Sequence, residues 1–546
     1  MKPLEGGQSG CPAELASLPD SSLSGLAIAL FAGLAQAASI AWPWALSNPL
    51  AALAGLQRGE PVWWLQLLAL GLLAWLVRGS RSWRRAALCG WLFGTAWVAG
   101  TVGWIFVAMH TYGGLPAVLA ALAVFTLSGL MALFYAAACG FFVTLVPGNR
   151  AWQAAVFAAL WLLAELARGT WLTGFGWGAT GYAHMDGPLA GFAPWIGVYG
   201  LCAMAAWLAM TLAQLGQVAQ GRSWRQRAAE VAVVALVLAT PFLANRYTTV
   251  PADPQASAGR LSVTLLQGNI PQDEKFETGS GVPLALQWYA QQLQLSRSSL
   301  VIAPETAVPL LPQQLPPGYW EALEQRFDSG EQAALIGIPL GNFEQGYTNS
   351  VLGLKPAQAQ AWRYDKHHLV PFGEFIPPLF RWFTEMMNIP LGDFNRGGLR
   401  QLPFTWHGQR VASNICYEDL FSEELALQFI DPAQAPTIFV NISNLAWFGD
   451  GLAMDQHLQI ARMRALEFER PFLLATNTGA TAIVDHRARI TGAIARGTRA
   501  VLVGEVEGRT RVTPYARWVA RFGLWPFWLL ALGLVLLARK PRKIRL

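Results

Sequence analysis

Charged residues are scarce in this sequence. Only 13% of its 546 residues are Asp, Glu, Lys or Arg, whereas 53% are hydrophobic. This balance is too apolar for a chain that is soluble throughout, so we expect part of it to lie in a lipid bilayer. The net charge of +6 is small, and Lys and Arg occur in short clusters between apolar runs instead of on one basic face. The sequence therefore argues against nucleic acid as a partner.

Cysteine is scarce as well. The five cysteines form no CxxC pair, and three of them lie in apolar segments, where a thiol usually behaves as a small hydrophobic group. They are Cys11, Cys89, Cys139, Cys202 and Cys416. This pattern predicts neither a disulfide framework nor a metal site, and we expect no cofactor. Cys416 differs from the others because it lies deep in the polar part of the chain.

Long hydrophobic runs, in contrast, are abundant. A helix that spans a bilayer needs about 20 apolar residues, and eight runs approach or exceed that length. They cover residues 24–45, 62–77, 86–109, 115–147, 152–167, 190–216, 228–245 and 522–538. We therefore expect a multi-span α-helical membrane bundle of about eight helices.

The first run has a second interpretation as a cleaved signal peptide. The small residues Ala35 and Ala37 fit the cleavage pattern of such peptides. The segment before the run is not basic, however, since it carries three acidic residues against the single Lys2. A retained helix is the favoured interpretation.

The positive charges between the runs predict an orientation, because short cytoplasmic loops are enriched in Lys and Arg. The basic clusters lie at residues 78–85, 150, 222–227 and 539–545. With eight spans, all four clusters fall on one side of the membrane, which places both termini in the cytoplasm. We expect a multi-pass protein of the bacterial inner membrane whose polar block lies in the periplasm.

These patterns divide the chain into four parts. We expect a polar N-terminal segment over residues 1–23 and a bundle of seven helices over residues 24–246. A periplasmic domain follows over residues 247–518, and a final helix with a basic tail covers residues 519–546.

The block from residue 261 to about 506 contains short β-rich runs separated by helical patterns. The expected strands cover residues 261–267, 300–304, 334–339, 348–354, 361–364, 411–415, 437–442 and 472–476. The expected helices cover residues 284–294 and 454–470. Such alternation predicts an α/β sandwich, and about 250 residues suffice for one domain of this kind.

Three polar residues stand at the ends of expected strands, where an α/β domain tends to present reactive groups. They are Glu305, Lys366 and Cys416. A thiol can attack a carbonyl carbon, a carboxylate can take the thiol proton, and an ammonium group can stabilise the oxyanion that develops. The three together form a complete set for acyl transfer, although each alone is more often a buried thiol or a solvated charge.

The strings around these residues resemble known sequences. Residues 303–307, 364–374 and 415–418 look like the Glu-Lys-Cys triad of the nitrilase superfamily. The long string from Lys366 to Glu374, with a membrane bundle before it and one span behind the domain, is similar to that of the apolipoprotein N-acyltransferase family. The resemblance covers nearly the whole chain except roughly its first twenty residues.

The resemblance implies a nitrilase-like αββα sandwich and a reaction in two steps. The cysteine takes an acyl chain from a phospholipid as a thioester, and the α-amine of the diacylglyceryl-cysteine at the N-terminus of an apolipoprotein then removes it. Family members also use residues that match Glu374, Tyr417 and Glu418. The implied partners are the phospholipid donor, the apolipoprotein acceptor and the bilayer.

The sequence departs from the family pattern in two places. Phe276 stands where a tryptophan is common, so it keeps an aromatic surface but lacks the indole donor. The string Gly174-Phe175-Gly176-Trp177 has a glycine where a proline is usual, which lowers local rigidity.

Aromatic residues beside the triad are candidates for substrate binding. An apolar stretch over residues 375–390 follows Glu374 directly and includes Trp382 and Phe383. It predicts either a core helix or an amphipathic lid at the membrane surface, and a lid explains better why it lies beside the site of a lipid enzyme. Phe276 and Trp447 are further candidates for contact with the lipid.

Several alternatives compete with this interpretation. His367, His368 and His457 raise a Cys-His mechanism or a metal site, although no further ligand spacing supports a metal. A membrane-tethered amidase with the same triad would act on a small C–N substrate in water. A lipid-binding or transport protein without catalysis would use charges inside the bundle, for which Glu165 and Arg168 are the candidates.

Overall fold

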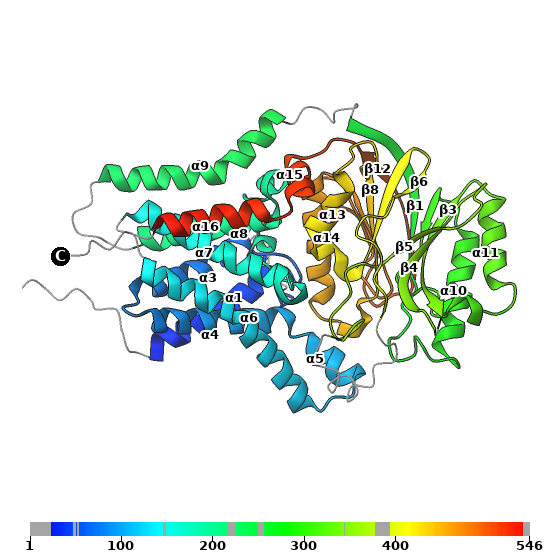
Figure 1. The fold of residues 1–546 in the computed structure, drawn as a ribbon, viewed down its shortest axis with the longest axis horizontal. Helices are drawn as coiled ribbons and strands as arrows, with labels where there is room; N and C mark the ends of the chain where they lie inside the picture. Colours follow the sequence, from blue (N-terminus) through cyan, green and yellow to red (C-terminus); the bar gives the residue numbers. More distant parts are fainter. Residues whose placement is uncertain are drawn as a thin grey trace, which may run out of the picture.

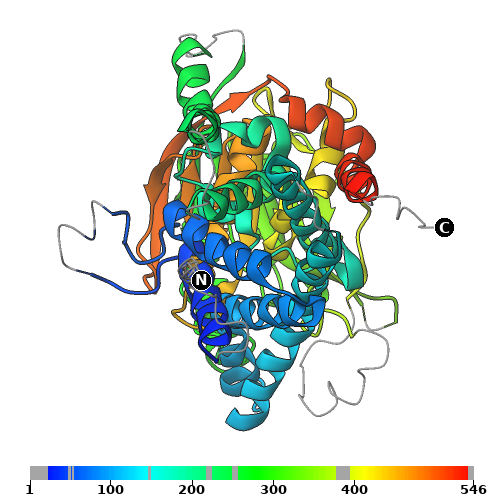
Figure 2. The ribbon, with the colours of Figure 1, turned by 90° about the vertical axis from the view of Figure 1, so that its left-hand side faces the viewer.

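The computed structural model describes residues 23–46, 51, 54–145, 149–216, 224–248, 256–342, 344–376 and 394–538. A helical bundle forms one end of the molecule and a β-sandwich forms the other (Figure 1). Viewed from the bundle end, the helices stand in front of the sandwich (Figure 2). The two parts correspond to the apolar and polar parts of the sequence.

The bundle contains the long apolar helices of the chain. They are α1 (Leu23–Ile40), α3 (Trp63–Gly79), α4 (Trp83–Val102), α5 (Ile105–Val107) with η1 (Ala108–Tyr112), α6 (Ala117–Leu145), α7 (Arg150–Thr170), α8 (Ala193–Leu215), α9 (Trp224–Thr248) and α16 (Trp525–Ala538). Each of the eight expected runs coincides with one of these helices or with the bent pair α4 and α5–η1.

Within the described residues, four helical segments are long and apolar enough to cross a membrane, and two bent helix pairs raise that number to six. The bent pairs are α4 with α5–η1, at 61°, and α15 (Pro514–Phe522) with α16, at 85°. The expected runs at 62–77 and 228–245 fall on shorter apolar helices. A membrane bundle is therefore confirmed, with four to six helices of spanning length where the sequence predicted about eight spans.

Glycines allow the first helices of the bundle to pack closely. A Cβ added at Gly33 of α1 would lie 2.3 Å from the carbonyl oxygen of Phe93 in α4. A Cβ added at Gly90 of α4 would lie 2.7 Å from the carbonyl oxygen of Tyr135 in α6. Small residues at such contacts let helix backbones approach, which is a main source of packing energy between helices in lipid.

The polar block folds into two six-stranded sheets. One has the order β12-β1-β2-β3-β4-β5 and the other has the order β11-β10-β9-β8-β7-β6. The strands are β1 (Ser257–Gln267), β2 (Leu300–Ile302), β3 (Ala333–Asn342), β4 (Gly346–Leu354), β5 (Trp362–Asp365), β6 (Phe404–Trp406), β7 (Gln409–Ile415), β8 (Ile438–Ser443), β9 (Phe472–Thr476), β10 (Ala482–Val484), β11 (Ile490–Ala493) and β12 (Ala500–Arg509). All eight expected strands are confirmed to within a few residues, whereas β6, β10, β11 and β12 were not predicted.

Helices cover both outer faces of the two sheets, so the expected αββα sandwich is confirmed. Buried aliphatic side chains from both sheets form the core between them. Helices α10 (Gly281–Leu295) and α11 (Tyr319–Asp328) pack on the face of the first sheet. Helices α13 (Ser422–Ala426) and α14 (Ala453–Phe468) lie between the second sheet and the bundle (Figure 1).

Helix α14 joins the two parts of the molecule. One continuous hydrophobic cluster contains Ile460 of α14 and Leu201 of α8. At the same interface Gln456 Oε1 accepts hydrogen bonds from Trp104 Nε1 at 3.0 Å and from Trp177 Nε1 at 2.7 Å. Buried polar groups need such partners, so these bonds fix how the sandwich sits on the bundle.

Candidate active site

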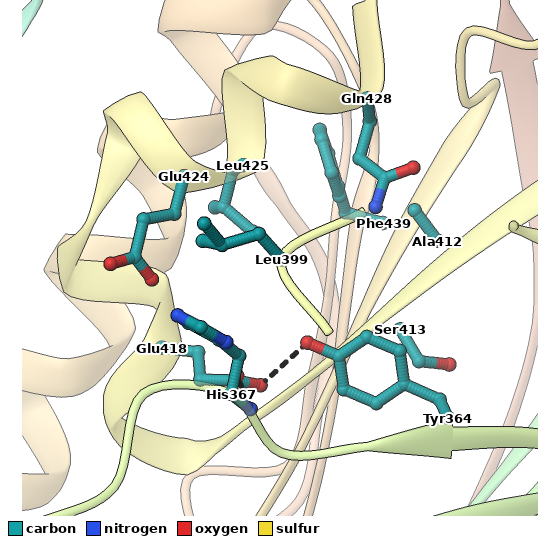
Figure 3. A pocket seen from close by; sticks show the side chains of 10 residues that line it. All are labelled: Tyr364, His367, Leu399, Ala412, Ser413, Glu418, Glu424, Leu425, Gln428 and Phe439. Atoms are coloured by element: carbon teal, nitrogen blue, oxygen red, sulfur yellow. Dashed lines mark hydrogen bonds between the residues drawn. The ribbon is translucent and has the colours of Figure 1, made fainter. Parts of the chain in front are cut away.

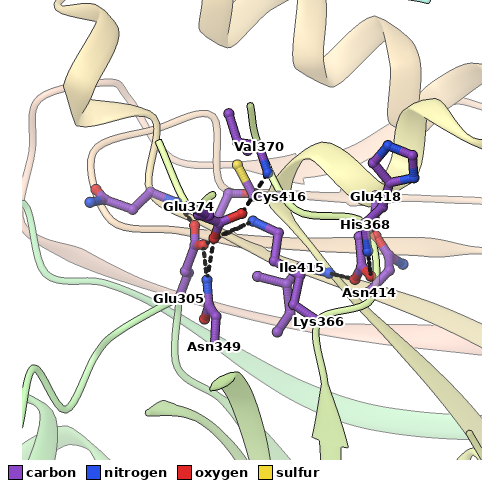
Figure 4. A network of polar contacts seen from close by, with 12 residues as sticks. Glu305, Asn349, Lys366, His368, Val370, Glu374, Asn414, Ile415, Cys416 and Glu418 are labelled. Atoms are coloured by element: carbon purple, nitrogen blue, oxygen red, sulfur yellow. Dashed lines mark hydrogen bonds and ion pairs between the residues drawn. The ribbon is translucent and has the colours of Figure 1, made fainter. Parts of the chain in front are cut away.

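Three loops bring the predicted triad together. Glu305 follows β2, Lys366 follows β5, and Cys416 follows β7 directly. Because β2 and β5 belong to the first sheet and β7 to the second, the site lies where the ends of both sheets meet. Figure 4 shows the side chains of Glu305, Lys366 and Cys416 converging there, together with Glu374.

Cys416 begins the turn η7 (Cys416–Leu420) with a backbone φ of +53°. Few residues other than glycine adopt this left-handed region, and such strain persists only where the surroundings hold it. Asn441 Nδ2 donates to the carbonyl oxygen of Cys416 at 2.9 Å, and His457 Nε2 lies 3.3 Å from the same oxygen. These two contacts therefore hold the backbone of Cys416, the candidate nucleophile, in this conformation.

Glu305 is held on both carboxylate oxygens. Its Oε1 accepts a hydrogen bond from Asn349 Nδ2 at 2.7 Å, and its Oε2 accepts one from the backbone N–H of Asn444 at 2.8 Å. Lys366 Nζ lies 3.5 Å from Oε1. The carboxylate thus has a fixed direction, which a general base requires.

Lys366 is 1% exposed and lies between two carboxylates. Its Nζ donates to Glu374 Oε1 at 2.8 Å, and Glu374 Oε2 accepts from the backbone N–H of Val370 at 2.8 Å. Burial disfavours the ammonium charge, but Glu374 and Glu305 outweigh burial and raise the pKa of Lys366 above its usual value. Lys366 therefore remains a cation in the interior.

The surroundings of the Cys416 thiol favour its protonated form. Burial raises its pKa well above the ordinary value, the charge of Glu305 raises it further, and Lys366 opposes the rise. Because the thiolate is the nucleophile, attack by this sulfur requires a base that takes its proton as the bond to carbon forms. A fixed carboxylate and a buried cation beside the thiol meet that requirement.

Glu418 and Tyr417 make hydrogen bonds to backbone groups of other loops. Glu418 Oε1 accepts from the backbone N–H groups of His367 and His368 at 2.7 and 3.1 Å, and its Oε2 accepts from Ile415 N at 2.7 Å. This carboxylate ties the loop after β5 to the end of β7 (Figure 4). The Tyr417 hydroxyl donates to the backbone carbonyl oxygen of Gly174, in the bundle, at 2.8 Å. Both residues therefore hold the loops that carry Lys366 and Cys416.

Three residues at the site were missed by the sequence analysis. Asn349 Nδ2 bridges Glu305 and Glu374, at 2.7 and 2.9 Å, and Asn444 N–H holds the other Glu305 oxygen. Lys275 Nζ donates to the carbonyl oxygen of Glu305 at 3.1 Å. Asn349 lies inside β4, Asn444 directly follows β8, and Lys275 lies in a turn, so no pattern in the sequence marked them. Lys275 alone had a signal in the sequence, because it precedes Phe276, a candidate for contact with the lipid.

Comparison with known proteins agrees with this arrangement. A family model described as apolipoprotein N-acyltransferase N-terminal domain matches residues 50–211, and one described as carbon-nitrogen hydrolase matches residues 262–515. Proteins named apolipoprotein N-acyltransferase match at 57% identity in Verminephrobacter eiseniae, over 91% of this chain and 92% of the relative, and at 44% identity in Ralstonia nicotianae, over 86% and 89%. The chain belongs to the apolipoprotein N-acyltransferase family. A relative of the same name in Bordetella bronchiseptica is 40% identical over 88% of this chain and 94% of its own length.

In this member of the apolipoprotein N-acyltransferase family, the three histidines that suggested a Cys-His mechanism or a metal site contact other groups. His367 Nδ1 contacts the carbonyl oxygen of Gly397 at 2.7 Å, and His368 stacks on Phe421 with ring centroids 3.5 Å apart. His457 faces the Cys416 carbonyl and Asp419 Oδ2, at 3.3 and 3.1 Å. These contacts involve no thiol, so they do not support a Cys-His pair. Among the described residues no group of three or more His, Cys, Asp or Glu side chains could hold a metal ion.

The aromatic candidates fall in different places. Trp447 is partly exposed in η9 (Leu445–Phe448) and meets the ring of Tyr112 edge-on, with centroids 5.9 Å apart. This contact places it where the sandwich touches the membrane segment α5–η1. Phe276 is partly exposed on the turn that carries Lys275. Trp382 and Phe383 lie outside the described residues.

A small hollow in the sandwich is lined in part by Glu418. It is bordered by Tyr364, His367, Glu424 and Gln428, among others, and the Tyr364 hydroxyl donates to Glu418 Oε2 at 2.9 Å (Figure 3). Neither Glu305 nor Cys416 is among the described residues that border it. The hollow is therefore not the place where an acyl group would meet the thiol.

Proposed function

We propose that this chain transfers a fatty acyl chain from a phospholipid to the N-terminal α-amine of the diacylglyceryl-cysteine of apolipoproteins, through a thioester on Cys416. The names of the relatives support the acceptor and the bond that is made. The membrane bundle supports a lipid donor, because the sandwich that carries the site packs directly against it. The observation that carries the mechanism is the convergence of Glu305, Lys366 and Cys416.

In the first step the sulfur of Cys416 attacks the ester carbonyl carbon of the phospholipid while Glu305 accepts the thiol proton. Lys366 stabilises the negative oxygen of the tetrahedral intermediate. As the intermediate collapses, the bond from carbon to the glycerol oxygen breaks and Glu305 returns the proton to that oxygen. Lysophospholipid leaves, and the acyl group remains on sulfur.

In the second step the α-amine of the apolipoprotein attacks the thioester carbonyl. Glu305 accepts a proton from the amine, Lys366 again stabilises the oxygen, and the carbon–sulfur bond breaks. The proton returns to sulfur and the amide product leaves. Dividing the reaction in this way lets one site serve two large lipid substrates in turn.

The proposed setting is the bacterial inner membrane, with the sandwich on the periplasmic side. The positive residues between the apolar runs support this orientation. The aromatic contact between Trp447 and Tyr112 supports entry of lipid from the membrane side of the sandwich. Phe276 and Trp447, with Trp382 and Phe383 as residues of a lid, are the proposed contacts with acyl chains.

Mass spectrometry of the purified protein tests the proposal. Labelled phospholipid alone should place the labelled acyl group on Cys416 and release lysophospholipid before any acceptor is added, and Cys416→Ala should abolish both. If lysophospholipid forms only when the acceptor is present, or if Cys416→Ala still transfers acyl groups, the thioester mechanism is wrong. A membrane-tethered amidase would instead hydrolyse a small amide and leave phospholipid intact.

A further inference from the structure

A loop of the bundle, residues 172–177, contacts both catalytic loops of the sandwich. The carbonyl oxygen of Thr173 lies 2.9 Å from His368 Nε2, and the carbonyl oxygen of Gly174 accepts the hydrogen bond from the Tyr417 hydroxyl at 2.8 Å. Two consecutive carbonyl groups thus meet two different loops of the sandwich.

These contacts lie close to the proposed reacting groups along the chain. His368 is two residues after Lys366, and Tyr417 follows Cys416 directly. A shift of the bundle loop would therefore displace the two loops that carry the proposed oxyanion partner and the nucleophile. Their relative placement matters, because a misplacement of about 1 Å can slow an enzyme about a hundredfold.

The bundle loop holds an unusual backbone shape. Leu172, Thr173 and Gly174 all have positive φ angles, of 54°, 77° and 79°. A Cβ added at Gly174 would lie 2.3 Å from the carbonyl oxygen of Gly169, so only glycine fits there. Two residues other than glycine keep such angles only when their surroundings determine them.

Arg168 of α7 supplies that support. Its NH1 donates to the carbonyl oxygens of Phe175 and Trp177, at 3.0 and 2.8 Å, and its guanidinium lies 5.4 Å from the ring centre of Trp97. The side chain is 1% exposed. A planar guanidinium can hold two carbonyl groups in a fixed relation, which a lysine cannot do in the same way.

Glu165 in turn holds Arg168. Its Oε2 pairs with Arg168 NH2 at 3.0 Å, and its Oε1 accepts from the backbone N–H and the hydroxyl of Thr180, at 3.0 and 2.5 Å. The pair is buried, and its hydrogen bonds reach two residues of the loop and Thr180, which follows the loop. Removal of one partner would leave an unpaired buried charge.

We propose that Arg168, held by Glu165, is a positioning residue that sets the placement of Lys366 and Cys416 through the bundle loop. The inference rests on the proposed function, because it assigns the two charges to acyl transfer. It also gives these intramembrane charges a role other than transport. The bundle is then part of the active site's support as well as its anchor.

A double-mutant cycle tests the inference. Arg168→Met should slow thioester formation about a hundredfold, as expected for a displaced nucleophile, with KM for phospholipid within about threefold. Tyr417→Phe should slow it about tenfold, the scale of one lost hydrogen bond. Arg168 holds the loop through Phe175 and Trp177, and the hydrogen bond from Tyr417 to Gly174 depends on that loop. The double variant should therefore be no slower than Arg168→Met alone.

Matched variants control for general damage. Tyr319→Phe also removes a tyrosine hydroxyl that donates to a backbone carbonyl, of Leu286 at 3.0 Å on the far side of the sandwich, and should leave the rate unchanged. Because Arg168→Met leaves Glu165 unpaired, Glu165→Gln/Arg168→Met removes both charges and should fold with the same loss of rate. Arg168→Lys should recover only part of the rate.

The rate at which iodoacetamide alkylates Cys416 gives a readout that needs no lipid. Arg168→Met and Tyr417→Phe should change it non-additively, as they change acylation. Effects of the two substitutions that multiply, or an alkylation rate equal to wild type in all variants, would overturn the inference. If wild-type protein forms no thioester, the proposed function fails, while the alkylation rates still decide whether Arg168 positions Cys416.

Discussion

Two buried lysines contact Glu305, and their surroundings differ. Lys366 Nζ meets the carboxylates of Glu374 and Glu305, which raise its pKa above the usual value although burial opposes this. Lys275 Nζ meets only the carbonyl oxygen of Glu305, at 3.1 Å, among the described residues, and burial lowers its pKa to about 8 against weaker opposition from Glu305 and Cys416. Similar burial thus gives opposite shifts, and the number of close carboxylates decides the sign.

The largest expected effect comes from Lys366. Lys366→Met should slow thioester formation by roughly a hundredfold or more, the scale of a lost oxyanion partner. It should also lower the melting temperature, because Glu374 and Glu305 would keep buried charges without their cation. Lysophospholipid release from labelled phospholipid and thermal unfolding of the same preparation measure the two effects.

Lys355→Met is the control for this substitution, because Lys355 is a partly exposed lysine that donates to the carbonyl oxygen of Thr405. It should change neither quantity appreciably. Unaltered acylation in Lys366→Met would remove Lys366 from the mechanism.

Glu374→Gln should have a smaller effect and would sharpen the comparison. It removes one of the two carboxylates beside Lys366, so the pKa of Lys366 should fall toward that of Lys275. The rate should fall about tenfold at neutral pH, the scale of one weakened charged contact, and more at alkaline pH as the ammonium loses its proton. A pH profile of thioester formation measures this change.

Glu324→Gln, at an exposed glutamate that accepts from Trp320, serves as the comparison variant. Its profile should match that of the wild type. A Glu374→Gln profile with the same shape as wild type at every pH would show that Glu374 does not hold the charge of Lys366.

The smallest expected effect is a gain in stability on replacing Lys275, whereas replacing Lys366 should lower stability. Because the folded pKa of Lys275 lies below that of the unfolded chain, the unfolded state binds more protons between about pH 8 and the usual lysine value, and stability rises with pH there. Lys275→Met should therefore be more stable than wild type below about pH 8. Each kcal/mol gained in the free energy of unfolding should raise the melting temperature by roughly 2 to 4 °C. This advantage should shrink as the pH rises toward about 10.4, the ordinary pKa of lysine.

Melting temperatures of the two proteins across this pH range provide the measurement. A lower melting temperature for Lys275→Met at every pH would mean that the contact with Glu305 outweighs the cost of burying the charge.

Much of the sandwich could be predicted because its strands are short apolar runs that end in polar residues. The three members of the proposed triad stand at such ends, so their types and their surrounding strings identified them. Strands β10 and β11 are only three and four residues long, and the first six residues of β12 alternate between partly buried and exposed positions, so their hydrophobic signal is weak. Their partners in the sheets, not their own composition, make them strands.

Contacts between distant segments could not be predicted at all. Asn349 and Asn444 touch Glu305 from loops and strands far along the chain, and nothing in a single sequence places them together. Helix α14 presented the same difficulty. The sequence predicted a helix over residues 454–470, but it did not predict that Gln456 and Arg464 are buried, because nothing in it showed that the bundle covers this helix.

The continuous core that joins α14 to α8 limits how the two parts of the molecule can be separated. If the bundle were cut away, the face of α14 that now contacts it would be exposed to water, and an apolar patch of that kind promotes aggregation. The bundle and the sandwich therefore depend on each other for a stable fold. A chimera that carries the sandwich of a relative would fold only if the residues of the two parts that face each other came from the same protein.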